Sequence, residues 1–175
     1  MKKLLLAVVA VALISGAAFA MDGENGEIKG KVGVQLLQSL SNGGSVDLDT
    51  GFSIGVEYLY PVHEMVKAGL GVEYMFDRKI EDTSVKVSQI PVYLTAEVAP
   101  IETLKELYFK ANLGWAFAKI KDGGASDSDS GFLWAVGAGY NLPYNIVIEA
   151  TYGMTYPSDV TYKALGINVG YRFGL

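Results

Sequence analysis

Apolar and polar residues alternate with a period of two in eight segments of this chain. In the clearest segment, residues 132–142, the even positions are aromatic or aliphatic and the odd positions are mostly glycine, alanine and asparagine. This period is that of a β-strand, whose successive side chains point to opposite faces. The pattern therefore predicts strands that separate two different environments.

The seven other alternating segments are of similar length. They span residues 28–38, 51–60, 66–76, 85–98, 107–119, 146–156 and 163–173. A tilted strand needs about 9–11 residues to cross a bilayer, so each segment is long enough to do so.

The segment 85–98 changes phase along its length. Val85 and Val87 are apolar at odd positions, whereas from Ile90 onward the apolar residues are even. Pro91 lies at this change, and proline donates no hydrogen bond to a neighbouring strand. We expect a β-bulge there; the alternative is that the strand begins only near Ile90.

The two faces of the segments differ in what they carry. The apolar faces hold no charged residue, as a lipid-facing surface requires, because Arg or Lys there costs about 2–4 kcal/mol at the bilayer midplane. Aromatic residues gather toward the segment ends, as at the two lipid–water interfaces. They are Tyr74, Phe76, Trp115, Phe117, Phe132, Trp134, Tyr152 and Tyr156 at one side, and Tyr58, Tyr60, Phe109, Tyr140, Tyr171 and Phe173 at the other. The chain is therefore predicted to be all-β, an eight-stranded antiparallel up-and-down transmembrane β-barrel, rather than a soluble barrel with an apolar interior.

The polar face carries acidic and basic residues in equal number. They are Lys31, Glu57, Lys67, Glu73, Glu97, Lys110, Glu149 and Arg172. The lumen of an eight-stranded barrel is only just wide enough for its own side chains, and an unpaired buried charge costs several kcal/mol. We expect these groups to pair and seal the lumen; the alternative is a gated polar path for small solutes or ions.

The joints between segments alternate in character. Polar joints span residues 41–50, 77–84, 121–130 and 157–161, whereas 61–65 and 142–145 are tight and 99–106 has room for one helical turn. Long joints on one side and short ones on the other are typical of outer-membrane barrels. An even number of strands then puts both termini on the short-turn, periplasmic side.

The N-terminus carries an export signal. Lys2 and Lys3 precede an apolar run from Leu4 to Ile14, and small residues lead to an A-x-A pattern ending at Ala20. This order predicts a signal peptide over residues 1–20, leaving a single domain over 21–175. Removing it takes the net charge from −5 to −7, which gives no reason to expect nucleic-acid binding. The absence of cysteine excludes disulfides and thiol chemistry.

Several short motifs resemble the small porin-like outer-membrane β-barrels of the OmpA, OmpX and OmpW type. They are Gln89–Leu94, Leu113–Ala116, Val136–Tyr140 and Gly170–Phe173. The resemblance implies that Tyr171 and Phe173 form a C-terminal signal for the barrel assembly machinery, although Gly174 and Leu175 follow where that family usually ends. It also implies periplasmic chaperones during biogenesis, contact with membrane lipid and lipopolysaccharide, and a monomer.

Residues for catalysis or metal binding are sparse. His63, the single histidine, falls in a tight turn, and Asp122, Asp127 and Asp129 lack the spacing of an EF-hand. We expect no enzyme activity, cofactor or metal. The sequence thus indicates a structural or porin-like role, with an OmpW-like transporter of small hydrophobic molecules, a lipid A-modifying enzyme or an adhesin as alternatives.

Overall fold

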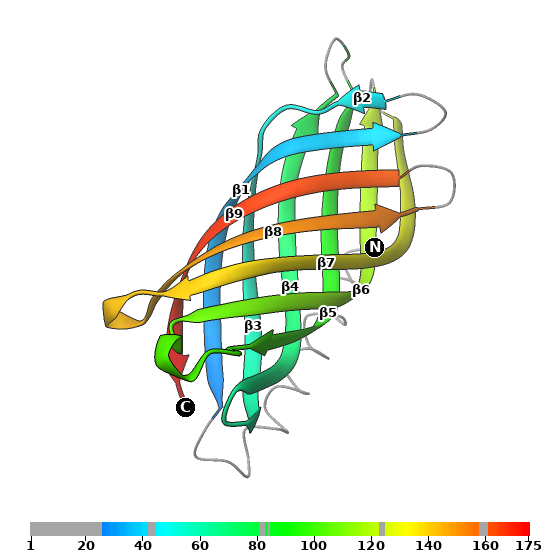
Figure 1. The fold of residues 1–175 in the computed structure, drawn as a ribbon. Helices are drawn as coiled ribbons and strands as arrows, with labels where there is room; N and C mark the ends of the chain where they lie inside the picture. The colour runs from blue at the N-terminus through cyan, green and yellow to red at the C-terminus, as the bar shows by residue number, and fades with distance from the viewer. Residues whose placement is uncertain (1–25, 42–44, 81–82, 84, 123–124, 158–160) are drawn as a thin grey trace.

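The computed structural model describes residues 26–41, 45–80, 83, 85–122, 125–157 and 161–175 (Figure 1). The predicted signal peptide lies outside them. The strands are β1 (Glu27–Ser41), β2 (Ser45–Asp47), β3 (Gly51–His63), β4 (Val66–Lys79), β5 (Lys86–Val98), β6 (Leu107–Asp122), β7 (Ala125–Asn141), β8 (Ile146–Tyr156) and β9 (Thr161–Gly174). Two 3-10 turns, η1 (Glu102–Leu104) and η2 (Pro143–Asn145), lie between strands. No helix among the described residues is long and apolar enough to span a membrane.

The strands form one closed antiparallel barrel. Each strand from β3 to β9 pairs with its neighbour in sequence, and β1 pairs with both β3 and β9, which closes the sheet. The short β2 pairs with the far end of β1 and leads into β3, so these two strands lie along the same edge of β1. The prediction of an eight-stranded up-and-down barrel is confirmed.

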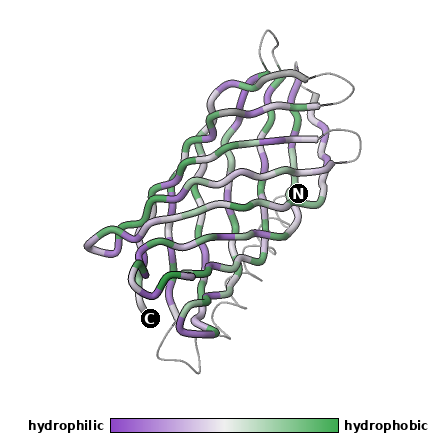
Figure 2. Tube along the Cα trace, viewed as in Figure 1, coloured by the Kyte–Doolittle hydropathy of each residue, from purple (hydrophilic) through white to green (hydrophobic). Residues whose placement is uncertain are grey.

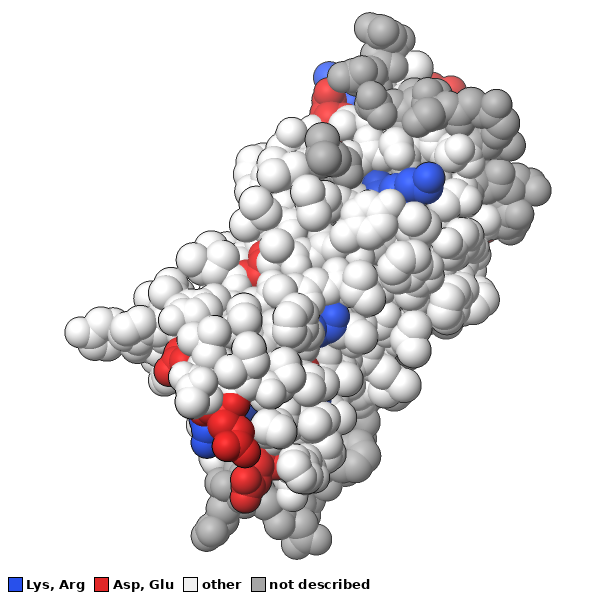
Figure 3. All heavy atoms as spheres, in the orientation of Figure 1, with Lys and Arg blue, Asp and Glu red and all other residues white. Residues whose placement is uncertain are grey.

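Side chains alternate between the barrel wall and its lumen. Outward residues such as Val32, Phe52 and Leu94 are 58%, 63% and 64% exposed, whereas inward Lys29 and Glu57 are fully buried. Hydropathy accordingly alternates along the strands in Figure 2. Most of the face shown in Figure 3 is uncharged, and its largest group of charged atoms lies toward the lower end. The aromatic residues predicted to form belts lie on the outer surface, and all but the partly buried Tyr58 and Trp134 are exposed.

The prediction of a bulge at Pro91 is wrong, and so is the alternative that the strand begins near Ile90. β5 begins at Lys86 and keeps one register with β6 throughout. Between β4 and β5 the register shifts from Met75 opposite Gln89 to Arg78 opposite Val87, so the extra residue belongs to β4. Odd residues of β5 point inward along its length. Val87 is apolar because it packs inside the barrel.

The joint over residues 121–130 differs from the prediction. Residues 121–130 are largely strand, because β6 runs to Asp122 and β7 starts at Ala125. The segment 99–106 holds the single 3-10 turn η1, in agreement with the one helical turn for which the prediction left room. The two ends of the barrel chain meet, since the Leu175 N–H donates to the Gly26 carbonyl at 2.9 Å.

Candidate functional site: the barrel lumen

Ten charged side chains meet inside the half of the barrel nearest the short turns. We call them the lumen charge cluster: Glu27, Glu57, Glu73, Glu97, Glu149, Lys29, Lys31, Lys67, Lys110 and Arg172. Five are acidic and five basic, so the cluster is neutral as a whole. Neutrality matters here because an uncompensated charge is strongly disfavoured in a space with so little water.

Lys29 is the centre of the cluster. Its ammonium nitrogen lies 2.7 Å from Glu57 Oε2, 2.5 Å from Glu97 Oε1 and 2.5 Å from Glu149 Oε1. These carboxylates come from three strands, and one oxygen of each lies within 4.8 Å of the others. The Lys29 side chain is fully buried. Its ammonium thus occupies the point where three carboxylates converge.

Glu57 links this centre to the rest of the cluster. It accepts from Lys110 at 2.6 Å and from the Tyr93 hydroxyl at 2.7 Å, and it lies 3.1 Å from Lys31 Nζ. Lys31 in turn lies 2.8 Å from Glu73 Oε2. The chain of ion pairs therefore extends along the barrel axis toward its middle.

The cluster also extends to the mouth at the short turns. Arg172 donates to Glu97 at 2.8 Å and to Glu27, which also accepts from Lys67 at 2.7 Å. The Lys67 side chain is 38% exposed, so this residue lies at the rim. The lumen charge cluster consequently forms a continuous network of ion pairs from the rim to the barrel middle.

Glycines on the lumen face make room for two tyrosine rings. A Cβ added at Gly71 would lie 2.4 Å from the Tyr93 ring, and one added at Gly139 would lie 2.2 Å from the Tyr108 ring. Contacts this short do not occur between real atoms. The small residues opposite the rings thus let each hydroxyl reach a carboxylate, and the Tyr108 hydroxyl donates to Glu149 at 2.7 Å.

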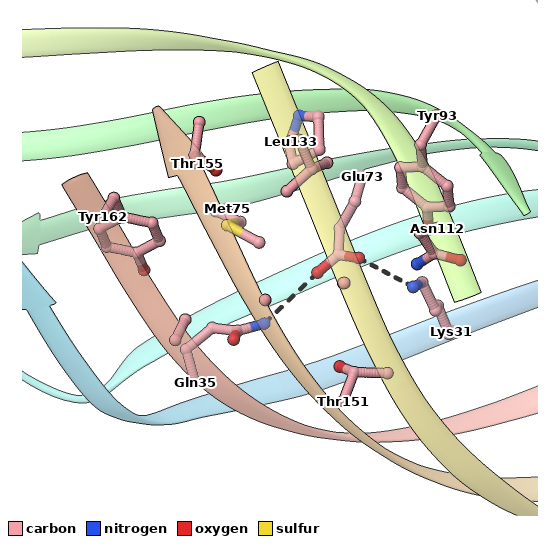
Figure 4. A pocket seen from close by; sticks show the side chains of 14 residues that line it. Lys31, Gln35, Glu73, Met75, Tyr93, Asn112, Leu133, Thr151, Thr155 and Tyr162 are labelled. Carbon is pink, nitrogen blue, oxygen red and sulfur yellow. Dashed lines mark hydrogen bonds and ion pairs between the residues drawn. The ribbon is translucent and has the colours of Figure 1, made fainter. Parts of the chain in front are cut away.

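A small chamber lies next to the lumen charge cluster, on the side away from the short turns (Figure 4). Its volume is 50 Å³, and Lys31, Gln35, Glu73 and Tyr162 are among the residues that line it. Gln35 donates to Glu73 at 3.4 Å across one side. The lining residue Asn112 has a buried Oδ1 that receives no hydrogen bond from the protein. The chamber has room for about three water molecules, which would satisfy such atoms.

An apolar cluster lies inside the barrel toward the opposite mouth. Four buried residues, Leu48, Val87, Tyr162 and Ala164, form a cluster against which Leu40 and Ile80 pack. Beside it, buried Arg78 donates to Gln38 Oε1 and to the Tyr162 hydroxyl. The described lumen therefore has three layers: the lumen charge cluster, a small polar chamber and an apolar layer.

The structure brings together seven of the eight predicted lumen residues in buried contact and places Lys67 at the rim. The predicted charge set omits Lys29 and Glu27, although the alternation already places Lys29 on the polar face of the first segment. Lys29 shares the odd parity of Lys31, and this parity was the available signal. Tyr93 and Tyr108 also belong to the site, as hydroxyl donors.

The remaining predicted residues lie outside the lumen site. Tyr171 and Phe173 point outward, 42% and 53% exposed, with ring centroids 4.6 Å apart. His63 is exposed at the end of β3, where its Nδ1 accepts from the Met65 N–H at 3.4 Å. Of the three aspartates, Asp122 lies on β6, and Asp127 and Asp129 lie on β7. They therefore belong to paired strands instead of the loop expected from sequence.

Comparisons with known proteins agree on the fold. Residues 6–173 match the family described as outer membrane protein beta-barrel domain. The chain is similar to Ail, the attachment invasion locus protein of Yersinia pestis, solved with the heparin analogue sucrose octasulfate (TM-score 0.62, 19% identity, 85% of this chain and 99% of that chain). It is also similar to Neisserial surface protein A (TM-score 0.58, 18% identity, 85% and 97%). A third similar structure is the N-terminal barrel of Pseudomonas aeruginosa OprF (TM-score 0.55, 18% identity, 87% and 100%). No curated protein matches the chain.

Proposed function

The chain belongs to the outer membrane β-barrel family, and we propose that it acts in the bacterial outer membrane as a structural barrel with a sealed lumen. The observation that carries this proposal is the charged plug, in which buried ion pairs of 2.5–3.3 Å cross the lumen between strands. An ion passing through would have to break such pairs, and breaking one buried pair costs about 3–5 kcal/mol. The apolar layer at the other mouth adds a second barrier.

Planar-bilayer recordings test the seal. The purified protein is expected to give no conductance steps. A neutral double variant, Glu57→Ser with Lys110→Ser, removes two interlocked side chains and is expected to produce steps. Steady conductance of the unaltered protein that changes on Glu73→Gln would support instead a gated polar path and refute the seal.

We further propose that the role is not catalytic. The support is that the buried glutamates, which would be the natural acid–base groups, are held by basic partners. Glu149, for example, lies 2.5 Å from Lys29 and 3.3 Å from Lys110. Lipid A from a deletion strain should have an unchanged mass; a shift by one acyl chain would contradict this part of the proposal.

The orientation proposed is that both termini face the periplasm, with Tyr171 and Phe173 read by the assembly machinery during insertion. The support is the meeting of the two ends at the mouth with the short turns. An epitope tag after Leu175 should be inaccessible to antibody on intact cells and accessible after the outer membrane is permeabilised. Replacing Phe173 by Ser should reduce the amount of inserted barrel.

A further inference from the structure

Arg78 is a buried cation outside the lumen charge cluster. It is 2% exposed and lies opposite Val87 in the apolar layer, where its guanidinium carbon is 5.0 Å from the centre of the Tyr162 ring. None of the ion pairs between described residues includes it. Arginine keeps its positive charge in proteins, and a buried charge without a counter-charge is strongly unfavourable. Arg78 therefore needs an anion that the described side chains do not supply.

Two features of the chain turn Arg78 into the lumen. Tyr74 and Phe76, at the preceding even positions of β4, are 40% and 46% exposed on the outer wall. The register shift between Met75 and Arg78 reverses this alternation, as a bulge does, so that Arg78 points inward. Gly51 leaves room for the arginine stem, because a Cβ there would lie 2.3 Å from Arg78 Cδ. The inward guanidinium thus depends on matching features of two strands.

The guanidinium has one satisfied side and one unsatisfied edge. Its Nη1 donates to Gln38 Oε1 and to the Tyr162 hydroxyl, which are both neutral. Its Nε is buried and has no acceptor among the described residues. Its Nη2 has only the sulfur of Met75, a weak acceptor, at 3.8 Å. Nε and Nη2 share the edge from which arginine donates two parallel hydrogen bonds to an anion, so this edge is free to bind one.

The unsatisfied edge borders the small chamber. Met75 and Tyr162, which both contact the guanidinium, line the chamber at the end away from Lys31 (Figure 4). The carboxylate in the lining, Glu73, is paired with Lys31 at 2.8 Å. Space for about three water molecules admits a halide or a formate ion and excludes a sugar or a nucleotide. The chamber therefore limits the ligand to a very small anion.

We propose that the chamber binds one small monovalent anion on the Nε–Nη2 edge of Arg78. A single negative charge balances the one cation that the lumen charge cluster leaves out. Arg78 is the residue before the last of β4, so the anion reaches it from the mouth away from the short turns without crossing that cluster. The inference goes beyond the sealed lumen and does not depend on it.

Urea unfolding of the full chain in lipid vesicles tests the site, with chloride or formate replacing gluconate at constant sodium concentration. Gluconate, a sugar acid, is too large for the chamber. An anion that binds only the folded protein should raise the urea midpoint by about 1 M when it exceeds its dissociation constant about a hundredfold. Arg78→Met should have the same midpoint in all three salts. The matched control, Lys79→Met, removes the same charge from the exposed neighbouring residue and should keep the shift.

A shift by only one of the two small anions supports the proposal and identifies the ion. Crystals grown with bromide, or with formate if only formate raises the midpoint, should show the ion in contact with Arg78 Nε. Heat-modifiable gel migration establishes that each variant is folded. If Arg78→Met does not fold, Gly51→Ala, whose Cβ displaces the arginine stem, should reduce the shift.

Three results overturn the proposal. The first is an equal midpoint of the original protein in all three salts. The second is a shift in Arg78→Met as large as that of the original protein, which would place the ion elsewhere. The third is a carboxylate of the chain itself bound to the Nε–Nη2 edge in the crystals.

Discussion

Replacing Lys29 by Met tests whether the lumen charge cluster is a balanced plug. The change removes the ammonium at the point where Glu57, Glu97 and Glu149 converge, while a methionine of similar length keeps most of the packing. Five acidic groups would then face four basic ones. The barrel interior would hold one uncompensated charge.

The size of the effect follows from the partners that remain. Glu97 keeps Arg172 at 2.8 Å, and Glu149 keeps Lys110 at 3.3 Å. No carboxylate is left without a cation nearby, so the loss is that of one buried charge. Removing one partner of a buried pair costs about 3–5 kcal/mol in the free energy of unfolding, which is the loss expected here.

Urea unfolding in lipid vesicles, followed by fluorescence of Trp115 and Trp134, measures this free energy. Adding Glu149→Gln to Lys29→Met restores neutrality. The double variant should therefore lose less stability than the sum of the two single variants, by about 0.5–3 kcal/mol. Lys67→Met is the control at the rim, where a partly exposed pair contributes about 0–1 kcal/mol. Strict additivity, or a loss at Lys29 no larger than at Lys67, would refute the plug.

Three further outcomes are expected. Lys29→Ala removes the ammonium from between three carboxylate oxygens that lie within 4.8 Å of one another. Ca²⁺ binds such oxygen ligands. Millimolar Ca²⁺ should therefore raise the urea midpoint of unfolding of this variant and leave that of the original protein unchanged. Gly139→Ala should lower the free energy of unfolding by about 1–3 kcal/mol, because its Cβ would overlap the Tyr108 ring; an unchanged value would show that the ring moves freely. Val32→Arg places a charge on an outward residue that is 58% exposed. If that residue faces hydrocarbon, the free energy of unfolding in vesicles should fall by about 2–4 kcal/mol. An unchanged value would show that position 32 does not face hydrocarbon.

The strands and their two faces can be read from the amino-acid sequence alone. The direction of a side chain from a strand is a local property with a period of two, so it is readable without knowledge of any neighbour. The segment predicted over residues 146–156 coincides with β8, and the inward positions of Glu57 and Lys110 follow from parity alone. The same rule places Lys29 on the polar face beside Lys31, although the predicted charge set did not include it.

Which lumen groups meet depends on how the strands are arranged around the closed barrel. Lys29 pairs with Glu97 and Glu149, which are 68 and 120 residues away along the chain. These contacts depend on the stagger between strands and on the closure of β1 against β9. The extra residue of β4 opposite β5 is a β-bulge, and it could not be predicted for the same reason. A bulge is a mismatch in residue number between two paired strands, so it cannot be read from either strand alone. Val87 was interpreted wrongly because an apolar residue of a membrane barrel can face either the lipid or the lumen. The closed barrel shows that Val87 faces the lumen.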